Sequence, residues 1–370
     1  LSHITFRDNL ANDGGALYLN GSSPVITNVT ISNNEATGDG GGILMVYFSN
    51  PILKNVNITD NIAGEWGGGM NIFYSEPIFL DSVSIINNKS GSGGGGLEIT
   101  GSDSVITNLI VTGNETEGEG GGIGLWSTNV ILTNVTISNN VANDGGGIYA
   151  WNSEATLTDL TIMNNVAESE GGGISIDEES DITLSNTNIE GNSAGTGNGG
   201  GIISWHSSLS ATNVTYSNNS AASCGGGIYL YNTEAILTDL SITDNVAKES
   251  GGGIIIDESE NVTLTNTNID GNSANHCGGG MVLWDSSPVL TNITITNNTA
   301  AWCGGGMDIF QSNPITQDIT VSGNISKWGG GIHLYNGISS ILSNMNLSNN
   351  EAIEGGGLAS YNDIDSPSFE

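Results

Sequence analysis

Aromatic and acidic side chains are interleaved at one position of a repeated segment, and this combination suits the recognition of sugars. The position is the fourth residue after each run of glycines, and nine of its fourteen occupants are Phe, Trp or Tyr. Aromatic rings can pack on the C–H faces of sugars, while carboxylates accept hydrogen bonds from hydroxyl groups. The candidate ligand-binding residues are Trp126, Trp151, Asp177, Trp205, Tyr231, Asp257, Trp284 and Asp285.

Two other roles for this aromatic stripe remain open. Large rings on a solvent-facing strand need cover, so the stripe could be an interface with another chain, a folded-back segment or a second copy. The rings could also stack on one another and stabilise the sheet without binding anything.

Catalysis by paired carboxylates is the next chemistry to consider. A glycoside hydrolase needs two carboxyl groups about 5 to 9.5 Å apart. Asp177 and Asp257 lie three repeats apart, which corresponds to roughly 14 Å in a stack of strands and is too far. Asp257 or Glu258 could meet the distance with Asp285, but such pairs are expected by chance in a chain with 39 acidic residues. We therefore assign no catalytic residue.

Two further sets of side chains could bind a metal ion or form a disulfide bond. Acidic residues precede the glycines in neighbouring repeats, and Glu119, Asp144 and Glu170 form a speculative calcium site; the alternative is a solvated acidic edge. Three cysteines occupy the same position: Cys224, Cys277 and Cys303. Cys277 and Cys303 belong to adjacent repeats and could form a disulfide, or remain free thiols.

The elements that would position these residues follow from the repeat itself. A Gly-Gly-Gly-apolar signature returns fourteen times at intervals of 25 to 28 residues, with short β-branched runs between copies. Such a period indicates stacked coils that bury a core between them. One asparagine also returns in every repeat, and it predicts a buried ladder of side-chain hydrogen bonds. Its central members are Asn140, Asn165, Asn192, Asn219, Asn245 and Asn272.

These features resemble the right-handed parallel β-helix, and in particular the repeat of the polymorphic outer-membrane proteins and autotransporter passengers. That repeat pairs Gly-Gly-Ala-apolar with Phe-x-x-Asn, as in Gly14–Leu17 and Phe6–Asn9 here. The resemblance implies one all-β solenoid over residues 1–370, with about fourteen coils of about 26 residues. The chain begins and ends within a repeat, which predicts a piece of a longer protein. Similar blocks near 142–221 and 222–300 indicate duplication of three coils at a time.

A more distant resemblance to pectate lyases implies eliminative cleavage of an acidic polymer, with calcium held by acids and a basic residue taking the proton. The formal net charge is −34, and Arg7 is the sole arginine. A site for an anionic polymer with so few cations is implausible, and the same charge excludes nucleic acid and anionic membranes as partners. No run of 18 apolar residues predicts a membrane span.

We therefore expect a non-catalytic, extracellular or cell-surface rod: an adhesin or structural segment whose partner is a glycan or another surface protein. No cofactor is required, although Ca²⁺ is a possible ligand. The alternative is a polysaccharide-degrading enzyme. An acid pair in a concave groove with perturbed pKa values would favour that alternative, whereas a flat stripe would favour the rod.

Overall fold

The computed structural model describes residues 1–75, 78–336 and 342–361, which form two compact units, Leu1–Gly195 and Thr196–Glu370. These described residues contain strands, turns and bends but no helix. Accordingly, none of them forms a helix that is long and apolar enough to span a membrane.

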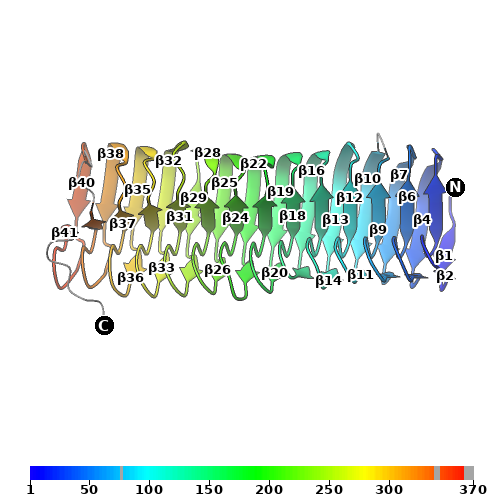
Figure 1. Ribbon diagram of the computed structural model, residues 1–370, viewed down its shortest axis with the longest axis horizontal. Helices are drawn as coiled ribbons and strands as arrows, with labels where there is room; N and C mark the ends of the chain where they lie inside the picture. Colours follow the sequence, from blue (N-terminus) through cyan, green and yellow to red (C-terminus); the bar gives the residue numbers. More distant parts are fainter. Residues whose placement is uncertain (76–77, 337–341, 362–370) are drawn as a thin grey trace. The chain divides into compact units, whose positions relative to one another are not determined.

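In each unit, the coils contribute strands to a long sheet, a short sheet and a post-glycine sheet (Figure 1). In residues 1–195 the long sheet contains β1 (Thr5–Arg7), β4 (Val25–Ser32), β7 (Ile52–Thr59), β10 (Ile78–Ile86), β13 (Ser104–Thr112), β16 (Asn129–Ser138), β19 (Glu154–Met163) and β22 (Asp181–Glu190). The short sheet contains β2 (Leu10–Ala11), β5 (Glu35–Ala36), β8 (Ile62–Ala63), β11 (Lys89–Ser90), β14 (Glu115–Thr116), β17 (Val141–Ala142), β20 (Val166–Ala167) and β23 (Ser193–Ala194). The post-glycine sheet contains β3 (Leu17–Asn20), β6 (Ile43–Val46), β9 (Met70–Phe73), β12 (Leu97–Thr100), β15 (Ile123–Trp126), β18 (Ile148–Trp151) and β21 (Ile174–Asp177).

The second unit repeats the pattern. Its long sheet contains β25 (Ser208–Ser217), β28 (Glu234–Thr238), β29 (Ser241–Thr243), β32 (Val262–Asp270), β35 (Val289–Thr296), β38 (Ile315–Ser322) and β40 (Met345–Ser348). The short sheet contains β26 (Ser220–Ala221), β30 (Val246–Ala247), β33 (Ser273–Ala274) and β36 (Thr299–Ala300). The post-glycine sheet contains β24 (Ile202–Trp205), β27 (Ile228–Tyr231), β31 (Ile254–Asp257), β34 (Met281–Trp284), β37 (Met307–Phe310), β39 (Ile332–Tyr335) and β41 (Leu358–Tyr361).

Successive strands of each sheet pair in parallel, with equivalent residues of neighbouring coils side by side. In the post-glycine sheet, for example, Ile123 pairs with Ile148, which pairs in turn with Ile174. This register is that of a right-handed parallel β-solenoid with about 26 residues per turn, as the repeat predicted. The predicted inward positions are also correct, because Ile148 and Ala150, the first and third residues after the glycines, are buried in the core.

The glycine run is required by close contacts between coils. Gly145 has a φ of +62°, in the left-handed region that side chains rarely adopt. A Cβ on Gly146 would lie 2.6 Å from the carbonyl oxygen of Gly172 in the next coil. A Cβ on Gly147 would lie 2.5 Å from the carbonyl oxygen of Gly173 and 3.1 Å from Nδ2 of Asn165. The close contacts therefore leave little room for a side chain at this turn in the inner coils, whereas the first coil accommodates Ala16 at the third position.

The repeated asparagines form the expected ladder inside each unit. The backbone N–H and Nδ2 of Asn140 both donate to Oδ1 of Asn165, at 3.0 and 2.9 Å, and Nδ2 also donates to the carbonyl oxygen of Val111. Asn245, Asn272 and Asn298 repeat the arrangement in the second unit. The members from Asn140 to Asn272 have no more than 1% of their surface exposed, so each amide bridges coils from within the protein.

A second column of Asn and Asp residues lies on the exposed side of the long sheet. Asp81 pairs with Lys54 of the neighbouring coil, and Ser82 occupies the left-handed position that Asn55 and Asp159 hold in their own coils. Asp81 nevertheless accepts a hydrogen bond from Asn108 in the next coil, at 2.8 Å.

Candidate functional site

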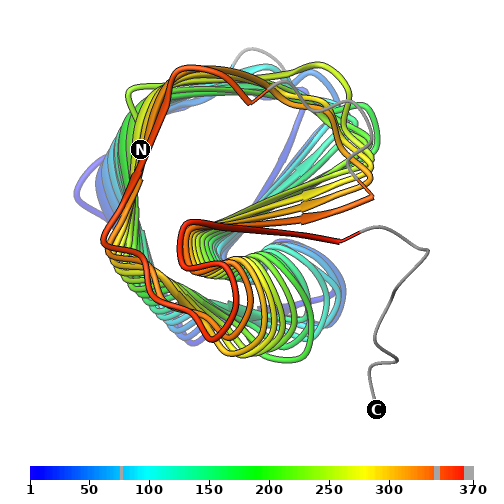
Figure 2. The same cartoon turned by 90° about the vertical axis from the view of Figure 1, so that its left-hand side faces the viewer.

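A groove runs beside the post-glycine sheet in each unit, on the face turned away from the main core. In the end view, the loop that precedes the glycines lies opposite this sheet in the stacked coils (Figure 2). The loop covers the second residue after the glycines and leaves the fourth residue at the groove's mouth. Glu98 in the first unit and Ile255 in the second, both second residues, are 1% and 0% exposed. The expectation that this column faces solvent is therefore wrong, because the preceding loop folds over it.

The groove of the first unit has a volume of about 470 Å³ and combines rings with acids. Trp66 comes from the loop, and Phe73, Trp126 and Trp151 come from consecutive or nearby strands of the sheet. The Trp126 ring centroid lies 5.8 Å from that of Trp66 and also 5.8 Å from that of Trp151. The lining also includes Asp39, Glu65, Asn71, Glu98, Thr100 and Ser127.

Three polar atoms beneath these rings have no hydrogen-bond partner within the described structure: Oδ1 of Asn71, Oε2 of Glu98 and Nε1 of Trp126. Asn71 and Glu98 are paired residues of β9 and β12, and Glu98 pairs on its other side with Gly124 of β15. A side chain at Gly124 would collide with the Glu98 carboxylate, so this glycine makes the space that Glu98 occupies. Buried polar groups of this kind are usually completed by water or a ligand.

Burial raises the pKa of several carboxyl groups around this groove. The pKa of Glu98 is well above its usual range because its carboxyl group is desolvated and lies near Glu119 and Asp39. Desolvation is also the main cause of the raised pKa values of Asp39 and Glu119. Asp177, at the end of β21, has a pKa of about 6 for the same reason, although a hydrogen bond from Tyr149 opposes the shift.

The predicted ligand-binding residues occupy two settings. Trp126, Trp151 and Asp177 are paired neighbours on one face of the first unit's sheet. Trp205, Tyr231, Asp257 and Trp284 are paired neighbours in the second unit, where the three rings pack against a buried cluster that includes Ile203, Tyr229 and Ile255. These second-unit rings therefore have a structural role. Asp285 follows β34, with an exposed side chain and a φ of +45°, outside the stripe.

The three acids proposed for calcium do not converge on one point. Glu119 and Asp144 are bridge partners in adjacent coils, and Oδ1 of Asp144 accepts a hydrogen bond from the backbone N–H of Glu170. Within the described residues, the group of three potential ligand atoms within 4.8 Å of one another is formed instead by Cys277, Cys303 and Asp308.

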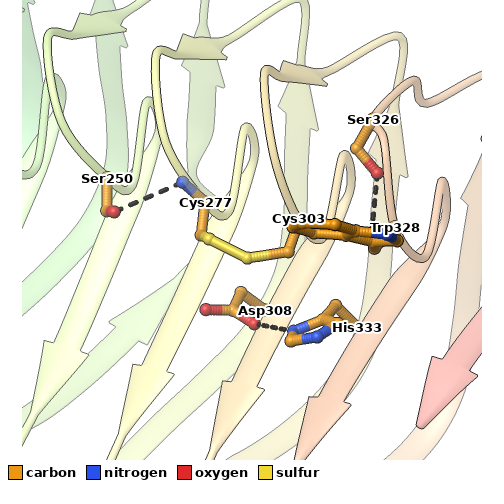
Figure 3. The surroundings of a disulfide bond; sticks show 7 residues. All are labelled: Ser250, Cys277, Cys303, Asp308, Ser326, Trp328 and His333. Atoms are coloured by element: carbon orange, nitrogen blue, oxygen red, sulfur yellow. Dashed lines mark hydrogen bonds and ion pairs between the residues drawn. A yellow bond between two sulfur atoms is a disulfide. The ribbon is translucent and has the colours of Figure 1, made fainter. Parts of the chain in front are cut away.

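Cys277 and Cys303 form a disulfide between adjacent coils (Figure 3). Cys224 is a buried free cysteine. The disulfide lies on the wall of a second groove, of about 340 Å³, whose floor holds Asp308 and His333. Nδ1 of His333 and Oδ1 of Asp308 are 2.6 Å apart, and both side chains are buried.

The sequence-based candidates included Trp126, Trp151 and Trp284 of the groove linings, but not the polar residues beside them. Trp66 and Glu65 precede the glycines, and Asn71, Glu98 and the Asp308–His333 pair occupy the second position after them. The available signal was a polar residue in a column that is apolar or aromatic in most other repeats, such as Ile203, Tyr229 and Val282. A polar residue at such a position indicates that the loop above it holds a partner or leaves a space.

A family model matches most of the chain. The family model described as right-handed beta helix region matches residues 1–158, 81–237 and 146–313. Among solved structures, the chain is similar to the crystal structure of Dettilon tailspike protein (gp208), with 12% identity and a TM-score of 0.44. That alignment covers 91% of this chain and 62% of the tailspike chain, so this chain spans less than two thirds of that protein. No curated protein matches the sequence significantly.

Proposed function

Since the chain belongs to the right-handed β-helix family, we propose that it is a segment of an extracellular or cell-surface rod that binds a neutral glycan in the groove of residues 39–151. The observation that carries this proposal is the set of rings at the groove's mouth. Phe73, Trp126 and Trp151 are only partly buried, and they lie on the open side of a sheet whose other face is a complete core. Partly exposed rings in a concave site suit stacking on sugars.

Polar groups in the same groove support a ligand rich in hydroxyl groups. Oδ1 of Asn71, Oε2 of Glu98 and Nε1 of Trp126 have no partner in the described structure, and because they are buried they can bond only to a hydroxyl group or water that enters the floor of the groove. A hydroxyl group can both donate and accept, so it can satisfy atoms of either kind. A metal cation cannot accept a hydrogen bond from the indole N–H of Trp126, which favours a hydroxyl-bearing ligand over an ion at this floor.

The negative charge around the groove restricts which glycans can bind there. Asp39, Glu65, Glu98 and Glu119 surround the groove, and the whole sequence has 5 basic residues against 39 acidic ones. Uronate polymers and sulfated glycans would be repelled. We therefore expect a neutral oligosaccharide as the ligand.

A glycan array probed with the purified chain tests this function. We expect selective signals from neutral glycans that Trp151→Ala weakens at least tenfold. Phe48→Ala is the matched control, because Phe48 is 85% exposed and lies outside the groove. Absence of any glycan signal, or equal signals from the wild type and the Trp151 variant, would count against the proposal.

Glycan hydrolysis is a second candidate, favoured by one observation. Glu98 is a carboxyl group with a raised pKa in a concave aromatic groove, near Glu119 and Asp39, and such a group can act as a proton donor. We favour binding over hydrolysis, because a proton donor must reach the glycosidic oxygen. Only 1% of the Glu98 surface is exposed, so its carboxyl group is poorly placed to do so. Release of reducing ends from an array ligand, abolished in Glu98→Gln, would establish the enzyme; binding without release would establish the rod.

A further inference from the structure

Four chemically reactive side chains meet at the second groove without a role in glycan binding. Cys277 and Cys303 extend from the loop side, and Asp308 and His333 extend from paired positions of β37 and β39 (Figure 3). The two Sγ atoms and one carboxylate oxygen of Asp308 all lie within 4.8 Å of one another. All four residues have 8% or less of their surface exposed.

We propose that reduction of the Cys277–Cys303 disulfide creates a binding site for a soft divalent cation, held by the two thiolates and the Asp308 carboxylate. Thiolates prefer metals such as Zn²⁺, and carboxylate oxygen is a common additional zinc ligand. Zinc–sulfur and zinc–oxygen bonds of about 2.3 and 2.0 Å place tetrahedral ligand atoms about 3.5 to 3.8 Å apart. Once the S–S bond is broken, rotation of the cysteine side chains can adjust the sulfur positions toward those values.

The backbone already presents the ligands in this arrangement. The two cysteines are bridge partners in adjacent coils, with Cα atoms 4.6 Å apart, and Asp308 follows Cys303 across the glycine turn of the same coil. Because every coil is hydrogen-bonded to its neighbours, breaking the S–S bond leaves the two Cα atoms in place. His333 holds the Asp308 carboxylate through the 2.6 Å contact and acts as a positioning residue.

Three protein ligands leave a fourth tetrahedral position for water or a groove-bound molecule. The adjoining cavity gives an ion access from solvent, and Trp284, Trp302 and Phe310 shield the site's sides. The acidic chain also raises the local concentration of cations.

Metal binding at this site depends on the redox state of the two cysteines, and the electrons and protons of each step can be accounted for. A dithiol or phosphine reductant supplies two electrons, and with two protons the S–S bond becomes two S–H groups. Binding of Zn²⁺ then releases those two protons and forms two S–Zn bonds. The disulfide form has no thiolate to offer, so it cannot bind the ion in this way.

Co²⁺ is the probe for the experiment, because it reports thiolate ligation as a charge-transfer absorption. The full chain is reduced with a phosphine, checked by circular dichroism for retained β-structure, and titrated with Co²⁺ and then Zn²⁺. We expect one equivalent of Co²⁺ with a charge-transfer band that Zn²⁺ abolishes. The oxidised chain should show no band, a comparison that requires no substitution.

Variants assign the ligands. Cys303→Ser should weaken Zn²⁺ binding at least 100-fold and Asp308→Asn at least tenfold, whereas Cys224→Ser should leave binding unchanged. His333→Ala should alter the Co²⁺ d–d bands while the charge-transfer band persists. A reduced chain that keeps its β-structure without binding Co²⁺, a chain that unfolds on reduction, or a band lost only in Cys224→Ser would overturn the proposal.

Discussion

The hydroxyl group of Tyr229 donates a hydrogen bond to the carboxylate of Asp257 at 2.8 Å. Tyr149 and Asp177 form the same pair in the other unit, and each partner is numbered 80 residues lower. In both pairs the tyrosine is the second residue after the glycines and the aspartate is the fourth residue in the next coil. The pair therefore belongs to the three-coil duplication seen in the sequence, and in each copy the tyrosine hydroxyl holds the carboxylate of the aspartate in the next coil.

The raised pKa values of these aspartates predict that mild acid stabilises the protein. Asp177 has a pKa of about 6 in the folded chain against 3.8 ordinarily, and the pKa of Asp257 is also raised by desolvation. The folded state thus binds these protons more tightly than the unfolded state. Stability from this source is fully present below pH 4 and is lost as the pH rises through 6.

Thermal unfolding measured between pH 4 and 8 checks this expectation. Asp177→Asn should stabilise the chain at pH 8 by on the order of 1 kcal/mol, with part of the shift discounted for solvent exposure. The variant should give no gain at pH 4. Asp181→Asn, at an exposed position, is the control. A melting temperature of Asp177→Asn that equals the wild type at pH 8 would show that the burial of Asp177 has no energetic consequence.

Replacement of a ladder asparagine should destabilise the chain strongly. In Asn165→Leu, the backbone N–H of Asn140 and the carbonyl oxygen of Ile137 lose their partners inside the protein. Leaving such groups unpaired costs about 1–3 kcal/mol. Urea unfolding provides the measurement, and Asn129→Leu, at an exposed strand position, should change stability little. Equal effects of the two substitutions would mean that the side-chain hydrogen bonds of the ladder do not contribute to the stability of the fold.

The third glycine of an inner coil should tolerate a side chain poorly, although Ala16 holds this position in the first coil. Gly147→Ala brings a methyl group against the carbonyl oxygen of Gly173, and we expect a loss of about 1–3 kcal/mol. Gly357 occupies the same column, but a methyl group there would meet only the Leu347 side chain, at 3.9 Å. Calorimetry of the two alanine variants should therefore separate them, and a stable Gly147→Ala protein would contradict the stacking argument.

Crowded acids before the glycines predict that cations stabilise the first unit. Glu119 lies beside Asp144, whose charge contributes to the raised pKa of Glu119, and Asp144 and Glu170 both raise the pKa of Asp177. Salt should raise the melting temperature by screening this repulsion. We propose that Ca²⁺ does so more strongly than NaCl at equal ionic strength. A purely solvated acidic edge would respond equally to both salts, and indifference to salt and chelator alike would show that the crowding is harmless.

Periodicity was enough to predict the fold, because the same residue types return wherever coils touch. The glycine run, Ile148 and Asn165 each recur at the period of the stack, and each has one role in every coil. The groove was not predictable in the same way. Glu98, Trp66 and His333 belong to columns whose residue type varies from coil to coil, and their environment depends on how a variable loop folds over the sheet. Trp126 and Trp205 occupy the same position of the repeat in different coils. The ring of Trp126 lines a groove, whereas the ring of Trp205 packs on a buried apolar cluster.

The most direct test of glycan binding compares two tryptophans from that one position by titration calorimetry with a neutral oligosaccharide selected on the array. Trp151→Ala should weaken binding at least tenfold and leave the melting temperature within about 2 °C of the wild type, because Trp151 lies at the mouth of the groove. Trp205→Ala should lower the melting temperature by several degrees without changing the affinity, because its ring covers the Ile203 cluster. The opposite pattern, with affinity dependent on Trp205 and indifferent to Trp151, would contradict the assignment of the groove as the glycan site.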